Sequence, residues 1–171
     1  MALLQMSALL CTVLALRVAS GAVIEVEKRS LCLDCPQGWT SIGERCFQYF
    51  PFKKSWAEAE LHCLSVGGNL ASVSSADEHT ALWQLLRGAD SSQQAAWLGG
   101  SDCQKEGTWL WSDGSVFKYT GWNLGEPNNL LVENCLHMGW AGLKGWNDIK
   151  CESQYAFICA LKGEGGAGVV G

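Results

Sequence analysis

The chain has 171 residues, a formal net charge of −5 at pH 7, and 48% hydrophobic residues. This length is sufficient for one domain with its own apolar core. From Ser30 onward there are 9 basic and 15 acidic side chains, and such an acidic chain is a poor binder of nucleic acid because the phosphate backbone is itself negatively charged.

Residues 1–20 have the pattern of a secretory signal peptide, with an apolar core at residues 9–16 followed by small residues. The apolar run is shorter than the roughly 20 residues of a membrane span, and no second candidate follows. The sequence therefore predicts a secreted, extracellular protein without a membrane span. Residues 21–29 end in Lys28 and Arg29, which mark either a pro-segment cleavage site or a solvated charge pair.

Eight cysteines remain after the predicted signal peptide. An even number behind such a signal indicates disulfide bonds formed in an oxidising compartment. Spacing alone does not choose among the many pairings that eight cysteines allow. The eight positions are Cys32, Cys35, Cys46, Cys63, Cys103, Cys135, Cys151 and Cys159.

Two helices are predicted from their capping residues. Ser55 is followed three residues later by Glu58, and Ser75 is followed by Glu78, which is the capping-box pattern. Apolar residues at helical spacing follow each box and give each helix one buried stripe. The stripes are Trp56, Ala59, Cys63 and Val66 in the first helix, and Leu82, Leu85 and Leu86 in the second.

Short strands are predicted at residues 46–50, 95–100, 109–111 and 155–159, where apolar residues alternate or form brief runs. Residues 119–149 contain few regular stretches, and a long irregular segment in a compact domain is usually functional. Residues 163–171 are rich in glycine and are predicted to be a flexible tail.

Five oxygen-bearing side chains, called the oxygen cluster below, stand within this irregular segment: Glu126, Asn128, Glu133, Asn147 and Asp148. Calcium binds about 6–8 oxygen atoms at about 2.3–2.6 Å. Five side chains leave room for a backbone carbonyl and for two oxygen atoms of a ligand. The sequence therefore predicts Ca²⁺ as a cofactor, at a site that also binds a ligand.

The oxygen cluster resembles the second calcium site of the C-type lectins. Three segments carry the resemblance, which covers roughly residues 35–160: Glu126-Pro127-Asn128, Glu133-Asn134-Cys135 and Trp146-Asn147-Asp148. The resemblance implies an α+β, C-type lectin-like fold over residues 30–162, with two helices, antiparallel sheets and a long calcium-binding loop. It also implies a cis peptide bond between Glu126 and Pro127.

The resemblance implies a role for each member of the oxygen cluster. Glu126, Asn128, Glu133 and Asn147 bridge the metal and a sugar, while Asp148 supplies a carboxylate and its own backbone oxygen. In this family Glu-Pro-Asn accompanies mannose, glucose and N-acetylglucosamine, whereas Gln-Pro-Asp accompanies galactose. The expected function is a calcium-dependent lectin of mannose type, which binds glycans, including those of microbial surfaces, in innate immunity.

The resemblance also implies three disulfides, Cys35–Cys46, Cys63–Cys159 and Cys135–Cys151. Cys32 and Cys103 remain, and they either form a fourth internal bridge or link separate chains. Type II antifreeze proteins, which are related, carry a partner for the equivalent of Cys103 beside the equivalent of Cys135. Here the neighbours of Cys135 are Asn134 and Leu136, which favours an interchain role and hence a disulfide-linked homo-oligomer.

An enzyme is not expected, because the chain has neither His-Glu-x-x-His nor Gly-x-Ser-x-Gly. Two other binding functions remain as alternatives. Type II antifreeze proteins share the fold but generally have ten cysteines and often threonines in the loop, where this chain has Leu130 and Leu131. Protein-binding lectin-like domains of venoms often lose calcium ligands, whereas this chain keeps all five.

Overall fold

The computed structural model describes residues 35–89, 95–130 and 132–161. The predicted signal peptide (1–20), the pro-segment (21–29), Cys32 and the tail (163–171) lie outside the described residues. The chain divides into two units, residues 1–30 and 31–171, and the second unit contains everything described below. Among the described residues, no helix combines the length and apolarity required to cross a bilayer.

Eight strands form one sheet with the order β1-β2-β8-β4-β6-β7, while β3 pairs with β8 and β5 pairs with β4. Every pairing is antiparallel except β4 with β8, which is parallel. In chain order the elements are β1 (Thr40–Ile42), β2 (Arg45–Lys54), α1 (Trp56–Ser65), β3 (Gly68–Leu70), α2 (Ala76–Ala89), β4 (Ala96–Ser101), β5 (Leu110–Trp111), β6 (Cys135–Met138), the 3-10 helix η1 (Trp140–Gly142), β7 (Trp146–Ile149) and β8 (Tyr155–Leu161).

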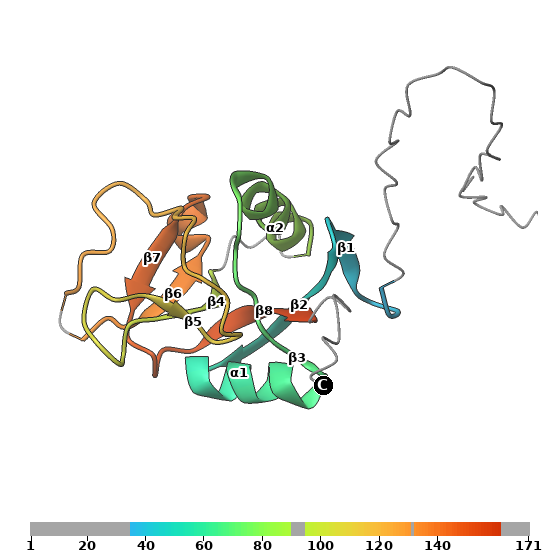
Figure 1. Ribbon diagram of the computed structural model, residues 1–171, viewed down its shortest axis with the longest axis horizontal. Helices are drawn as coiled ribbons and strands as arrows, with labels where there is room; N and C mark the ends of the chain where they lie inside the picture. The colour runs from blue at the N-terminus through green and yellow to red at the C-terminus, as the bar shows by residue number, and fades with distance from the viewer. Residues whose placement is uncertain (1–34, 90–94, 131, 162–171) are drawn as a thin grey trace, which may run out of the picture. The chain divides into compact units, whose positions relative to one another are not determined.

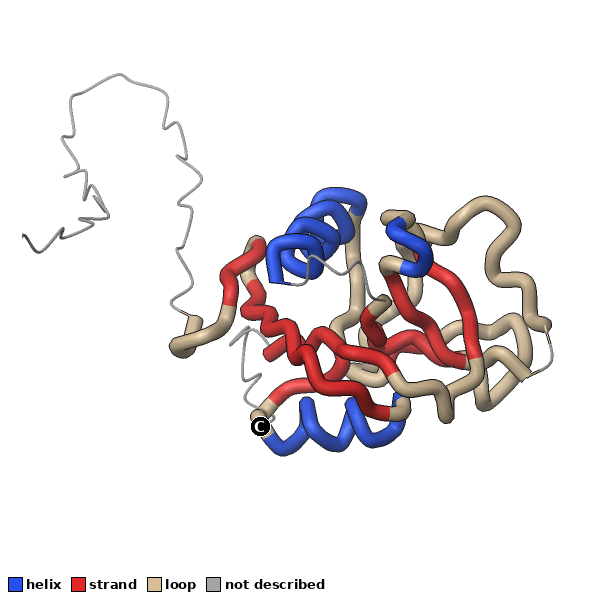
Figure 2. The backbone as a smooth tube through the Cα atoms, turned by 180° about the vertical axis from the view of Figure 1, so that it is seen from behind, coloured by secondary structure: helices blue, strands red, loops and turns tan. Residues whose placement is uncertain are grey.

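The two helices lie on opposite sides of the β2–β8 pair (Figure 1), and the reverse view shows the same arrangement (Figure 2). Helix α1 begins with the predicted capping box: Ser55 Oγ accepts from Glu58 N, and the Glu58 carboxylate accepts from Ser55 N. Its inner face buries Ala59 and Cys63. Val66, predicted on the same stripe, is 39% exposed because the helix has already ended there.

At the start of helix α2, one of the two hydrogen bonds of the second predicted capping box is present. Ser75 Oγ accepts from Glu78 N at 3.2 Å, but the Glu78 carboxylate accepts from Ser74 N and Oγ instead of from Ser75 N. The same carboxylate pairs with Arg45 of β2 at 3.1 Å, so a tertiary ion pair draws it away from the helix start. Leu82 and Leu86 are buried as predicted, while Leu85 is half-buried.

Residues 119–149 are more regular than the sequence predicts, because β6 and β7 form an antiparallel hairpin within them. Leu136 lies opposite Asp148, and His137 lies opposite Asn147. The connection between the two strands is seven residues long and includes η1, so it lacks the two-residue turn signal that makes hairpins recognisable. The hairpin brings Asn147 and Asp148 into the sheet.

The described residues contain three disulfides, Cys35–Cys46, Cys63–Cys159 and Cys135–Cys151, the same pairs that the resemblance implies. Cys63–Cys159 joins α1 to β8, and Cys135–Cys151 joins the start of β6 to the segment after β7. Removal of such a bridge from a small secreted domain typically costs about 2–5 kcal/mol. Of these two, Cys135–Cys151 restrains the ends of the hairpin that carries Asn147 and Asp148.

Candidate functional site

The oxygen cluster draws on one strand and on the loop that precedes the β6–β7 hairpin. Asn147 and Asp148 belong to β7 and are 8% and 0% exposed. Glu133 stands two residues before β6, and both Glu133 and Glu126 are half-buried, whereas Asn128 is exposed. The Glu126–Pro127 peptide bond is cis, as the resemblance implies.

Asp148 is the point at which the loop is attached to the sheet. Its Oδ1 accepts a hydrogen bond from Asn128 N at 3.0 Å, and its Oδ2 accepts one from Asn129 N at 2.8 Å. Glu126 Oε2 also accepts from Asn128 N, at 3.0 Å. These hydrogen bonds bring Glu126 and Asn128 next to Asp148, although Glu126 and Asp148 are 22 residues apart in the sequence.

The carboxylates of the cluster repel one another. The pKa of Glu126 is raised by burial, and then by its hydrogen bond with Asp148 and by the negative charge of Asp148. Burial and the charge of Asp148 likewise raise the pKa of Glu133. Among the described residues, no Lys, Arg or His forms an ion pair with any of the three carboxylates; the ion pairs found there join Arg45 to Glu78 and Asp113. Three carboxylates and two amides that form no ion pair among the described residues fit a hard cation such as calcium.

Asn147 is held by two hydrogen bonds. Its Nδ2 donates to the Asp148 carbonyl oxygen at 2.7 Å and lies 3.0 Å from His137 Nε2. His137 is fully buried, and burial lowers the pKa of its imidazole to about 3, so the ring is neutral. Sequence reasoning gave His137 no part in the site, because only the register of the hairpin places it opposite Asn147.

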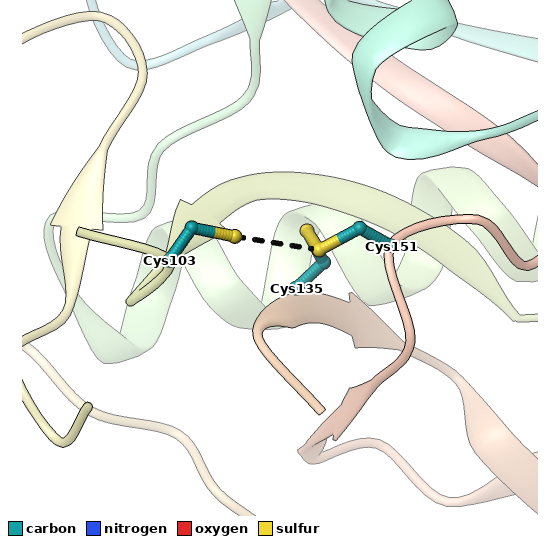
Figure 3. Close-up of side chains that lie close together, drawn as sticks. All are labelled: Cys103, Cys135 and Cys151. Carbon is teal, nitrogen blue, oxygen red and sulfur yellow. Dashed lines mark hydrogen bonds between the residues drawn. A yellow bond between two sulfur atoms is a disulfide. The ribbon is translucent and has the colours of Figure 1, made fainter. Parts of the chain in front are cut away.

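A free thiol lies beside the disulfide that closes the hairpin (Figure 3). Cys103 is exposed and is the free cysteine of the described residues. Its Sγ is 3.6 Å from Cys151 Sγ. Two of the three neighbouring sulfurs already form the Cys135–Cys151 bond, so the group does not offer three thiolates to a metal. Cys32, the other cysteine left without a predicted partner, is outside the described residues.

Two helices beside a mixed sheet, three disulfides and an oxygen-rich loop attached to β7 define a C-type lectin domain. The family model described as the Lectin C-type domain matches residues 52–161. The chain belongs to the C-type lectin family.

Similar proteins within this family differ in what their names say they bind. The galactose-specific lectin nattectin of Thalassophryne nattereri is 38% identical over 146 residues, covering 85% of this chain and 91% of nattectin. A C-type lectin mannose-binding isoform of Notechis scutatus scutatus is 39% identical and covers 80% of this chain and 87% of its own. A type-2 ice-structuring protein of Hemitripterus americanus is 35% identical, with 75% of each chain covered.

Solved structures show the same range. The C-type lectin CEL-I from Cucumaria echinata superposes with a TM-score of 0.72 at 32% identity, covering 76% of this chain and 99% of CEL-I. A calcium-independent type II antifreeze protein superposes with a TM-score of 0.68 at 36% identity, covering 74% of this chain and 93% of its own. These relatives are lectins and antifreeze proteins, so the family is not one of enzymes. The fold itself does not require calcium.

Proposed function

We propose that this protein is a secreted, calcium-dependent lectin that binds mannose-type glycans, including those of microbial surfaces, and serves innate immune recognition. The observation that carries the proposal is the attachment of the Glu126–Asn128 loop to the buried carboxylate of Asp148. This attachment gathers oxygen atoms that lack a basic partner among the described residues. The predicted signal peptide and the three disulfides support secretion.

Calcium would be held by the side-chain oxygens of the oxygen cluster and by the Asp148 carbonyl oxygen. When bound, the ion supplies two positive charges against the three carboxylates, and open positions for two oxygen atoms of a ligand. The pKa values of Glu126 and Glu133 are raised by burial and by the charge of Asp148, although the charge of Lys150 partly offsets this for Glu133. A bound cation would favour the ionised form of both carboxylates. The oxygen ligands that this chain offers are therefore suited to calcium, without any argument from its relatives.

The order of the cluster residues supports the mannose-type preference. A sugar hydroxyl can donate one hydrogen bond and accept others. Glu126 offers an acceptor and Asn128 a donor on one side of the cluster, and Glu133 and Asn147 offer the same pair on the other. Because relatives of similar identity are named for galactose and for mannose, overall similarity does not decide the sugar. The preference rests on these side chains.

A glycan array run in calcium and in EDTA tests the proposal. Binding to mannose, glucose or N-acetylglucosamine ligands is expected in calcium and is expected to vanish in EDTA. Glu133→Gln, which removes one cluster charge, should lose this binding, while the exposed Glu44→Gln should retain it. Binding that is unchanged by EDTA, or no glycan binding at all, would reject the proposal.

The double substitution Glu126→Gln with Asn128→Asp is expected to reverse the sugar preference from mannose to galactose. It keeps an oxygen at each position and leaves the net charge unchanged, but it exchanges the donor and the acceptor around one hydroxyl. A hydrogen bond to a charged group contributes about 1.5–3 kcal/mol, so each affinity should change by roughly tenfold or more. Competition with free mannose and galactose measures the ranking. A calcium titration serves as the control, because calcium affinity should change little, and an unchanged sugar ranking would assign selectivity to other loop residues.

Cys103 is proposed to link two copies of the chain. The thiol is exposed and forms no disulfide among the described residues, and secretion would place it in an oxidising compartment. The native protein is expected to migrate as a covalent dimer on non-reducing gels, and Cys103→Ser is expected to migrate as a monomer. Peptide mapping tests the alternative. A disulfide-linked peptide pair that joins Cys32 to Cys103 within a monomeric chain would show a fourth internal bridge and would contradict the interchain link.

Ice binding is the second candidate function, because a type-2 ice-structuring protein is 35% identical to this chain. It is tested by thermal hysteresis of the purified protein, measured with and without EDTA. Hysteresis in a protein that fails to bind any glycan on the array would replace the lectin proposal. No hysteresis, together with calcium-dependent glycan binding, would remove the ice-binding candidate.

A further inference from the structure

The hydrogen bonds of Asn147 determine which atom of His137 carries the proton. Asn147 Nδ2 lies 2.7 Å from the Asp148 carbonyl oxygen, and a carbonyl oxygen can only accept. The amide therefore presents its nitrogen, not its oxygen, on this side. The same nitrogen is 3.0 Å from His137 Nε2, so Nε2 must be an acceptor, and the ring proton is on Nδ1.

His137 is an unfavourable residue for an ordinary core position. The residue is fully buried, and its Nδ1 has no hydrogen-bond partner among the described residues. A buried polar atom without a partner lowers stability, and each such atom requires an explanation. The imidazole is surrounded by rings, with centroid distances of 4.8 Å to Tyr155, 5.8 Å to Trp97 and 5.9 Å to Trp140. Phenylalanine would suit this environment without the unpaired N–H, but it would offer no acceptor to Asn147.

We propose that His137 is a positioning residue, which holds the Asn147 amide so that Oδ1 faces the cation site and one N–H remains for the bound sugar. The proposal rests on the proposed function. An amide has two N–H groups; one donates to His137 and the other donates to the Asp148 carbonyl in this structure. If that carbonyl held a cation, it would no longer accept from Asn147, and the second N–H would be available to a sugar hydroxyl. Without the His137 acceptor, the amide can rotate by half a turn and present its nitrogen where an oxygen ligand is needed.

Two variants test the role of the acceptor. His137→Phe keeps an aromatic ring among Tyr155, Trp97 and Trp140 but removes the acceptor. His137→Gln places an amide oxygen near the position of Nε2 and so restores an acceptor. Loss of a group that orients a metal ligand typically weakens metal affinity by about 10–100-fold. The calcium Kd of His137→Phe is expected to rise by that factor, and the calcium Kd of His137→Gln is expected to stay within about threefold of the original.

Melting temperatures without calcium separate this role from a structural one. Without calcium, His137→Phe is expected to melt close to the original protein, because it removes the unpaired Nδ1–H of His137 but leaves one N–H of Asn147 without its acceptor. Its calcium affinity is nevertheless expected to fall. A His137→Phe variant that folds and binds calcium with unchanged affinity would overturn the proposal. Equal loss of calcium affinity in the Phe and Gln variants, with both folded, would also overturn it.

Nitrogen NMR of the calcium-free protein tests the inference independently of the proposed function. The expected spectrum shows a His137 ring protonated at Nδ1, with Nε2 bonded to the Asn147 amide. A ring protonated at Nε2 would overturn the inference even if the protein binds calcium and sugar. If the original protein binds no calcium while the expected spectrum is observed, the proposed function fails and the hydrogen bond between His137 and Asn147 stands.

Discussion

Calcium at about a hundred times its Kd is expected to raise the melting temperature of this protein by roughly 10 °C, and EDTA is expected to reverse the shift. A ligand that binds only the native state stabilises it by RT ln(1 + [L]/Kd), or about 2.7 kcal/mol at that concentration. One kcal/mol corresponds to a few degrees, about 3–6 °C, for a domain of this size. Thermal denaturation in millimolar calcium and in EDTA measures the shift.

The stabilisation should depend on the carboxylates of the oxygen cluster. In the calcium-free protein the negative charge of Asp148 acts on both Glu126 and Glu133. None of the three carboxylates forms an ion pair among the described residues, so a bound cation is expected to relieve their repulsion. Glu133→Gln is expected to lose most of the calcium-induced shift. Glu44→Gln removes the same charge at an exposed position and should show the full shift. A melting temperature that does not respond to millimolar calcium would contradict the assignment of the cluster as a calcium site.

Calcium affinity is expected to fall steeply as the pH falls from 7 toward 4.5. The pKa values of Glu126 and Glu133 are raised above their ordinary value of 4.5 in the calcium-free protein. Each carboxylate must lose its proton to bind the ion, so protons compete with calcium as soon as the pH approaches the raised pKa values. Below them the Kd should rise about tenfold per pH unit for each proton released, and so about a hundredfold for the two glutamates. Calcium titrations at several pH values give this slope.

The calcium-free and calcium-bound proteins should respond to acid in opposite ways. In the calcium-free protein, a raised pKa means that the two glutamates favour the folded state below about pH 4.5, and that this contribution is lost as the pH rises through the raised pKa values. With calcium bound, the adjacent positive charge lowers both pKa values, so stability is present near neutral pH and is lost in acid. In Glu126→Gln one proton fewer is released on calcium binding, so the calcium Kd should rise only about tenfold per pH unit in acid. A calcium Kd that is constant between pH 7 and about pH 4.5 would exclude these glutamates as ligands.

The amino-acid sequence was sufficient to predict the helix starts, the cysteine set and the five candidate residues of the oxygen cluster, because these depend on residue types at short spacing. The capping box at Ser55 needs only a side chain that reaches a backbone N–H three residues away. The three segments of the oxygen cluster were recognisable because each keeps its residue types at short spacing. The resemblance to the C-type lectins then implied the disulfide pairs, which spacing alone did not choose.

Tertiary structure alone decided how these residues meet. The Glu78 carboxylate does not complete the predicted capping box because it forms an ion pair at 3.1 Å with Arg45, which is distant in sequence. The β6–β7 hairpin has no short turn signal, and only its register places His137 opposite Asn147. Similarly, the raised pKa values of Glu126 and Glu133 arise from burial and from Asp148. Burial and the approach of residues distant in the chain are properties of packing, so side chains that look unrelated along the sequence become one site only when the sheet forms.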